Sequence, residues 1–154
     1  MTVIADKMLT VAAIKNGTVI DHIAAGQALR IVSMLHLNNH RKKVSLGLNL
    51  PSKSLQYKDI IKVEDKELTP DEANQVSILA PQATINIIKD FEVIKKFKVQ
   101  TPKNIANVLI CPNPTCITNH ENIGSFFDLY EHKKNIQLHC KYCKKMFSHE
   151  EIRS

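Results

Sequence analysis

The chain of 154 residues has no tryptophan, few aromatic residues and only four glycines, which lie far apart. Such scattered glycines exclude a glycine-rich loop for binding phosphates. The G-x-S-x-G and H-E-x-x-H motifs of common hydrolases and metalloproteases are also absent. The longest apolar segment, residues 23–37, is interrupted by polar and charged residues, so we expect no contact with membranes. Residues 1–15 lack the apolar core of a secretory signal, which predicts a cytoplasmic protein.

The chain does contain a regular set of four cysteines in its last third. Cys111 and Cys116 form a C-x4-C pair, and Cys140 and Cys143 form a C-x2-C pair after 23 intervening residues. Two close pairs on either side of a long segment are typical of a tetrahedral zinc site. Disulfides would need an oxidising compartment, and a C-x-x-C redox motif would leave the first pair unexplained. Because four thiolates leave no open coordination position, we expect one structural Zn²⁺ without a catalytic role.

Four histidines lie in the same part of the sequence and offer an alternative ligand set. Any of them is in principle able to replace a cysteine, but solvated or neighbouring histidines are the simpler interpretation. They are His120, His132, His139 and His149.

The net charge of +6 raises the possibility of a nucleic-acid partner. From Pro102 onward there are seven basic and five acidic residues, and four thiolates with one zinc dication bring this segment close to neutral. A zinc ribbon that bound phosphate backbones would carry the positive charge itself. A nucleic-acid-binding zinc ribbon therefore remains only the alternative hypothesis, and we expect no nucleic-acid partner.

The first two thirds of the chain alternate between strand and helix patterns. Asn16-Gly17 between two β-rich runs predicts a hairpin over residues 8–23. Apolar spacing predicts a helix over residues 25–37. Thr69-Pro70-Asp71-Glu72 forms a capping box for a second helix that ends before Pro81. Further strands are expected at residues 44–50, 57–64, 84–88 and 91–99. This order predicts an α+β fold with both helices on one face of a sheet.

A division into two domains follows from the pattern around Pro102. We expect a first domain at 1–101, a linker over 98–104 and a zinc domain at 102–154. The zinc domain should have a strand leading into Cys111 and a long hairpin from Phe126 to His139. About 50 residues bury too little apolar surface to fold alone, so this part should depend on its metal.

The lysines of two predicted strands allow two interpretations. Lys58, Ile60 and Lys62 share one strand face, and Lys96 and Lys98 share a face with Ile94 in regular geometry. Such lysines form either a solvated face or an anion site. Asp21-His22 is a weak candidate for a catalytic dyad, because neighbouring residues in a regular strand point to opposite faces.

Six motifs give the chain a family resemblance. They are GTVIDHI (17–23), GLNLPS (47–52), KDIIKVE (58–64), APQATIN (80–86), NVLICPNPTCI (107–117) and CKYCKKMFSH (140–149). Together they resemble the regulatory chain of aspartate carbamoyltransferase over nearly the whole length, from Leu9 to Glu150. The resemblance implies a ferredoxin-like α+β allosteric domain followed by a small zinc-ribbon (rubredoxin-like) domain.

The same resemblance implies a function without catalysis. It implies a dimer of regulatory chains that bridges catalytic trimers in pyrimidine biosynthesis, with CTP as inhibitor and ATP as activator. The zinc domain would dock on the catalytic chain of aspartate carbamoyltransferase.

Nucleotide-site residues are implied at the positions that match the family motifs. His22 and Lys96 would lie near the phosphates, Asp21 near the sugar, and Lys62 would distinguish one nucleotide from another. The implied set is Val11, Ile14, Asp21, His22, Lys58, Ile60, Lys62, Asn86, Ile88, Phe91, Val93 and Lys96.

Three positions depart from the family pattern. Ala12 replaces a glutamate, Phe91 replaces a tyrosine, and Lys95 replaces a glycine. We expect the missing acid at Ala12 to affect base preference, base contacts through the main chain to survive the change at Phe91, and Lys95 to add positive charge beside the phosphates.

Overall fold

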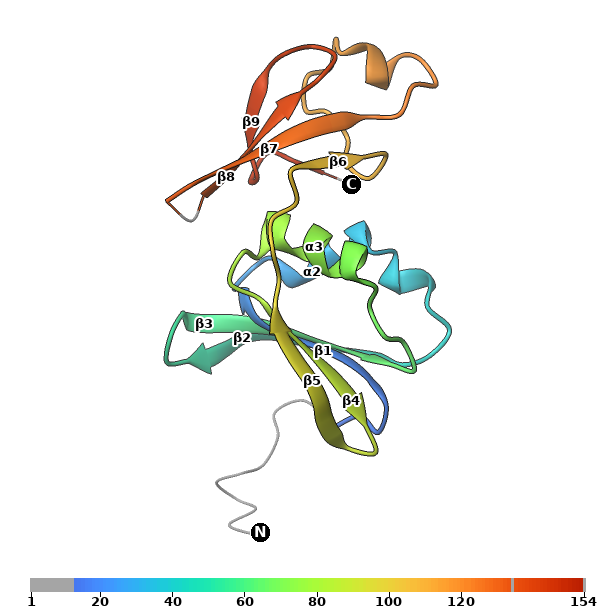
Figure 1. Cartoon of the computed structure of the whole chain (residues 1–154), viewed down its shortest axis with the longest axis vertical. Helices are drawn as coiled ribbons and strands as arrows, with labels where there is room; N and C mark the ends of the chain where they lie inside the picture. The colour runs from blue at the N-terminus through green and yellow to red at the C-terminus, as the bar shows by residue number, and fades with distance from the viewer. Residues whose placement is uncertain (1–12, 134, 154) are drawn as a thin grey trace.

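A computed structural model describes residues 13–133 and 135–153 (Figure 1). Its larger part is an antiparallel five-stranded sheet in the order β2-β3-β1-β4-β5. The strands are β1 (Gly17–Ala24), β2 (Val44–Ser52), β3 (Gln56–Glu64), β4 (Thr84–Lys89) and β5 (Glu92–Lys98). The predicted α+β class is confirmed. The arrangement is ferredoxin-like, with β5 added beside β4.

The predicted hairpin at Asn16-Gly17 is wrong. Both edges of β1 are already occupied, because Gly17 lies opposite Glu64 of β3 and opposite Ile88 of β4. No preceding strand can therefore pair with β1 there. Gly17 has φ +142°, and a Cβ atom at this position would lie 2.0 Å from the carbonyl oxygen of Val63. Glycine is thus required by the close approach of β3, and no hairpin turn is involved.

Asn16 joins the start of β1 to two turns. Its carbonyl oxygen accepts a hydrogen bond from the backbone N–H of Asp65 (3.0 Å). Its side-chain oxygen accepts a hydrogen bond from the backbone N–H of Asp90 (3.1 Å). The Asn-Gly pair therefore fixes the position of β1 between β3 and β4.

Two helices cover one face of this sheet (Figure 1). They are α2 (Ala28–Met34), followed by the short 3₁₀ helix η1 (Leu37–Asn39), and α3 (Pro70–Leu79). The capping box of α3 is confirmed: Thr69 Oγ1 accepts from the N–H of Glu72, and the Glu72 carboxylate accepts from the N–H of Thr69. Helix α2 is shorter than predicted and has no side-chain cap of its own.

Asp59, which is buried in β3, accepts the first N–H group of α2 and two N–H groups outside the helix. Its carboxylate accepts hydrogen bonds from the N–H groups of Gly26 (2.9 Å), Ala28 (3.2 Å) and Asn49 (3.0 Å). A helix start and the irregular part of β2 are thus held by one distant carboxylate.

The helices and the sheet enclose an apolar core. Alternate residues of β1, β3 and β4 point to the helices, and the opposite residues form an open face that no described helix covers. The core side chains from the sheet are Ile20, Ile23, Ile61, Val63, Ile85 and Ile87. Those from the helices are Ala28, Ile31, Met34, Ala73, Val76, Ile78 and Leu79.

The smaller part is a four-stranded antiparallel sheet in the order β6-β7-β8-β9. Its strands are β6 (Asn104–Ala106), β7 (Phe126–His132), β8 (Asn135–Cys140) and β9 (Met146–Ser148), with the 3₁₀ helix η2 (Ile117–Asn119). The long hairpin β7–β8 is confirmed. The predicted strand into Cys111 is reduced to the single bridge Ile110–Arg153.

The two parts are joined by a linker, by hydrogen bonds and by a shared apolar core. Residues 99–103 connect β5 to β6. Arg30 of α2 donates hydrogen bonds to the carbonyl oxygens of His149 (3.0 Å) and Ile152. Buried apolar side chains of both parts belong to one contiguous core. Among the described residues, no helix is long and apolar enough to cross a membrane.

Candidate functional site

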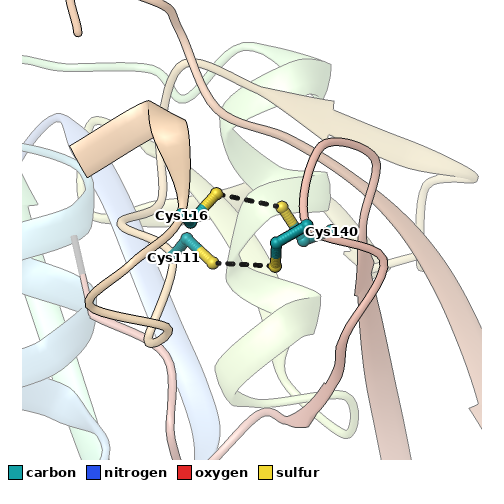
Figure 2. A group of neighbouring side chains, drawn as sticks. Cys111, Cys116 and Cys140 are labelled. Atoms are coloured by element: carbon teal, nitrogen blue, oxygen red, sulfur yellow. Dashed lines mark hydrogen bonds between the residues drawn. The ribbon is translucent and has the colours of Figure 1, made fainter. Parts of the chain in front are cut away.

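The four cysteines of the smaller sheet converge on one point. Figure 2 shows Cys111, Cys116 and Cys140 with their sulfur atoms turned toward one another. Cys111 and Cys143 have their Sγ atoms 3.8 Å apart, Cys116 and Cys140 have theirs 3.7 Å apart, and all four sulfurs lie within 4.8 Å. Sulfurs bound at about 2.3 Å around a tetrahedral ion are separated by about 3.8 Å. The four cysteines therefore fit one tetrahedral metal ion.

Neighbouring polar groups position the sulfurs. Asn113 is buried and accepts hydrogen bonds from the N–H and the hydroxyl of Thr115 (3.1 and 2.9 Å). The amide of Asn119 donates to the carbonyl oxygens of Cys111 (2.9 Å) and Asn113 (2.8 Å). Thr118 Oγ1 lies 3.2 Å from the sulfur of Cys116. These contacts fix the loop that carries the first two cysteines.

The thiols of this cluster differ in their readiness to ionise. Burial raises the pKa of Cys111 and of Cys140, and the neighbouring thiols raise both further. Burial also opposes ionisation of Cys143, but hydrogen bonds from the Lys145 N–H, from Asn113 and from the other thiols lower its pKa to about 7. Four thiolates at this spacing need a cation between them, since their mutual repulsion is otherwise unbalanced.

Histidine is not part of the described metal cluster, which consists of the four cysteines alone. The ring of His120 lies 2.6 Å (Nε2 to O) from the carbonyl oxygen of Pro114 and so has a partner of its own.

A second candidate site lies on the open face of the five-stranded sheet. The strand register places Ser45, Lys62, Val19, Asn86 and Lys96 in one row across all five strands. Neighbouring strands are about 4.8 Å apart, so the backbones of Lys62 and Lys96 are separated by about 14 Å. Two ammonium groups and one amide thus project from the same row.

Asp21 lies in the next row, where β1 has a bulge between Ile20 and Ile23. Lys58 Nζ lies 2.8 Å from Asp21 Oδ1, which also accepts the backbone N–H of His22 (2.7 Å). Burial opposes ionisation of Asp21, yet the hydrogen bonds from Lys58 and His22 lower its pKa.

The bulge gives His22 a left-handed backbone, with φ +57°. Its Nδ1 atom is buried, has no hydrogen-bond partner among the described residues and lies 4.0 Å from Asp21 Oδ2. The regular strand geometry assumed for this pair is therefore wrong. No hydrogen bond joins the two side chains, so the pair lacks the hydrogen-bonded geometry of a catalytic dyad.

Lys62 differs from the other lysines of the open face because only 8% of its surface is exposed. Burial lowers its pKa, and the charge of Asp21 partly opposes this effect. The interpretation of this lysine as part of a solvated face is therefore wrong. Lys96 is exposed, and the exposed fraction alone does not distinguish its two interpretations.

An apolar surface lies beyond the Lys62 row, toward the β4–β5 turn. Phe91 and Val93 are 65% and 55% exposed, and Val93 pairs with Ile88. The Phe91 N–H donates to the carbonyl oxygen of Lys15 (2.9 Å), which brings the buried Ile14 to this turn. Val11 and Ala12 lie outside the described residues.

The register of β5, which contains a second bulge, corrects two expectations. The register shifts between Ile87 and Ile88, so Val93 and Lys96 share the open face while Ile94 does not continue it. Lys95 lies opposite Ile87, whose side chain faces the helices, and its ammonium group is 5.3 Å from the ring of Phe97. Lys95 therefore points away from Lys96 and adds no direct contact on the open face.

Both parts of the chain match families of known proteins. Residues 9–100 match the family model "Aspartate carbamoyltransferase regulatory chain, allosteric domain", and residues 103–153 match its "metal binding domain". This chain belongs to the family of aspartate carbamoyltransferase regulatory chains. The regulatory chain of Tolumonas auensis is 47% identical over 144 residues, covering 94% of each chain. That of Vibrio campbellii is 42% identical over 145 residues, covering 94% of this chain and 95% of the relative.

Membership in the regulatory-chain family defines the kind of molecule. Its members are regulatory chains with an allosteric domain and a metal-binding domain, and the chain is regulatory rather than catalytic. The sequence predicted the cysteines but not Asn113, Thr118 and Asn119, because their spacing does not indicate contacts with the metal-binding loop. It also left Lys98 out of the site, although this residue pairs with Thr84 beside Asp21.

Proposed function

We propose that the open face of the first sheet binds nucleoside triphosphates, CTP and ATP, and that the metal-binding module docks on the aspartate carbamoyltransferase catalytic chain. The observation that carries the nucleotide proposal is the row across the sheet in which Lys62, Asn86 and Lys96 share one face. Ammonium groups and an amide on one surface provide the charges and donors that a triphosphate and a sugar require.

The chemistry of the face changes in one direction along β5. Val93 and the nearby Phe91 offer an apolar end, and Lys96 and Lys98 offer a basic end on the same face. A nucleotide fits both ends of this face when its base lies on the apolar end and its phosphates lie on the lysines. Asp21, held by Lys58, lies at the basic end, in the same row as Lys98 and two strands away from it, and offers an acceptor for sugar hydroxyls.

We assign zinc to the cysteine cluster because a closed set of four thiolates at tetrahedral spacing is the ligand set that zinc prefers. The ion would contribute folding free energy to residues 102–154, whereas residues 1–101 would form the nucleotide-binding domain. Docking of the metal-binding module is supported by its exposed apolar side chains. They include Ile117, Tyr130, Tyr142 and Met146.

Three further elements of the proposal rest on family membership. They are a homodimer of regulatory chains, a role in the control of pyrimidine biosynthesis, and a cytoplasmic location.

Two adjacent lysines of β5 provide the test. Lys96→Met removes an exposed charge from the open face, and Lys95→Met removes an exposed charge from the opposite face. A charge-assisted contact contributes about 1.5–3 kcal/mol, so Lys96→Met should weaken ATP and CTP binding by about tenfold to a hundredfold. Lys95→Met should change either affinity by less than about threefold. Isothermal titration calorimetry of the full chain measures both.

Equal losses in the two variants would show a general effect of net charge and would refute a site on the open face. An unchanged affinity in Lys96→Met would do the same. The ratio of ATP to CTP affinity should stay constant in Lys96→Met, because both nucleotides carry the same phosphates.

A further inference from the structure

A polar cleft of about 500 Å³ lies between the two parts of the chain. The large sheet supplies His22, Thr84 and Lys98 to its wall, and β7 of the metal-binding module supplies Glu131. Loop residues complete the lining: Ser54, Pro81 and Gln82. We call this space the interdomain cleft.

The interdomain cleft begins where the basic end of the open face stops. Lys98 follows Lys96 by two residues on the same face of β5, a step of about 7 Å along the strand. Thr84 lies between Lys98 and Asp21 in the neighbouring row. A chain of phosphates that starts at Lys96 and continues along β5 therefore enters the cleft beside Lys98 and His22.

Glu131 is the one acidic group among the described residues that line the cleft. It lies near the end of β7, where it pairs with Ile136 of β8, and it is exposed. The residues that face it from the sheet include the cation Lys98 and the imidazole of His22. A carboxylate of the metal-binding module thus lies across a solvated cleft from basic groups of the allosteric domain.

We propose that Glu131 senses the phosphate end of the bound nucleotide and transmits its presence to the metal-binding module. This inference rests on the proposed nucleotide site. A triphosphate carries about four negative charges, which compete for Lys98 and repel Glu131 across the cleft. Binding then favours positions of the β7–β8 hairpin in which Glu131 is farther from the sheet. By linkage, any partner that holds the hairpin close to the sheet weakens triphosphate binding to the same extent.

The test is Glu131→Gln in the full metal-loaded chain, titrated with ATP and with AMP. Loss of one repulsive charge across solvent should tighten ATP binding by about twofold to fivefold at low salt. The gain should be smaller for AMP, whose single phosphate ends nearer Lys96, and smaller for ATP at high salt. Glu131→Lys should increase the gain for ATP. Glu121→Gln is the matched control, because it removes an exposed acid of the same module that does not line the cleft.

Circular dichroism and metal analysis serve as the control that each variant is folded and metal-loaded. If ATP binds wild type and is weakened by Lys96→Met, yet Glu131→Gln and Glu131→Lys bind it as wild type does, the role of Glu131 is refuted and the nucleotide site stands. An equal gain in Glu121→Gln would also refute it, since net charge alone would explain both. If wild type binds neither nucleotide, the proposed site and this inference fail together.

Discussion

Replacing Lys62 by methionine should affect stability and nucleotide binding in opposite directions. Lys62 is 8% exposed and its pKa is lowered by burial, so its charge is held at a cost in the free chain. Burial disfavours the charge of Lys62, and an apolar side chain of similar length removes that cost where no partner is left with an unpaired charge. Asp21 keeps its ion pair with Lys58 (2.8 Å) and is not left alone. We therefore expect the free energy of unfolding to rise by 0 to about 2 kcal/mol.

Nucleotide binding should weaken in the same variant. A partly buried ammonium that contacts a nucleotide contributes about 1.5–3 kcal/mol, which corresponds to about a tenfold to hundredfold loss in affinity. Because Lys62 lies one strand from Val19 and two from Asn86, away from the basic end at Lys98, its loss should also change the ratio of ATP to CTP affinity. Urea unfolding without ligand and calorimetric titration with each nucleotide measure the two effects.

The pH dependence provides an independent check on Lys62. A lysine whose pKa is lowered in the folded state binds its proton more tightly when unfolded, so stability rises with pH between the folded pKa and the ordinary value of 10.5. The stability difference between Lys62→Met and wild type should therefore be greatest near neutral pH and should shrink toward pH 10.5. A Lys62→Met protein that is clearly less stable than wild type, with unchanged nucleotide affinities, would refute this reasoning.

Two further variants test the metal site and the helix start. Cys143→Ser removes one of the four sulfurs, so it should lower the metal content and unfold residues 102–154. The variant should then fail to assemble with the catalytic chain. Normal assembly without bound metal, measured by native gel and metal analysis, would contradict this expectation. Thr69→Ala removes the acceptor of the Glu72 N–H and should lower the free energy of unfolding by about 1 kcal/mol. Thr69→Asp keeps an acceptor at the helix start and should retain most of the wild-type stability. Urea unfolding measures both variants.

Local chemistry explains which parts of the fold could be predicted from the sequence. The capping box at Thr69 and the alternation in β3 depend on residues a few positions apart. The cysteine pairs are also recognisable because metal ligation imposes its own spacing. The hairpin at Asn16-Gly17 was wrong because Gly17 is required by Val63, a residue far along the chain.

The two bulges could not be predicted from the sequence either. One extra residue in β1 or β5 reverses the faces of the residues around it, and only the register with the neighbouring strands reveals it. This is why Ile94 was assigned to the wrong face, while the Lys58–Lys62 face in the regular part of β3 was predicted correctly. The expectation that Lys95 lies beside the phosphates came from the family resemblance and not from the strand pattern.

The two attachments between the parts of the chain determine how they are able to move. A body held at a single flexible joint rotates about three axes, whereas a body held at two separated points rotates only about the line that joins them. Residues 99–103 and the hydrogen bonds of Arg30 to His149 and Ile152 are such a pair of points. Rotation about that line also displaces the buried apolar side chains that both parts share in one core, so an effector that changes this angle must supply the free energy of repacking that contact.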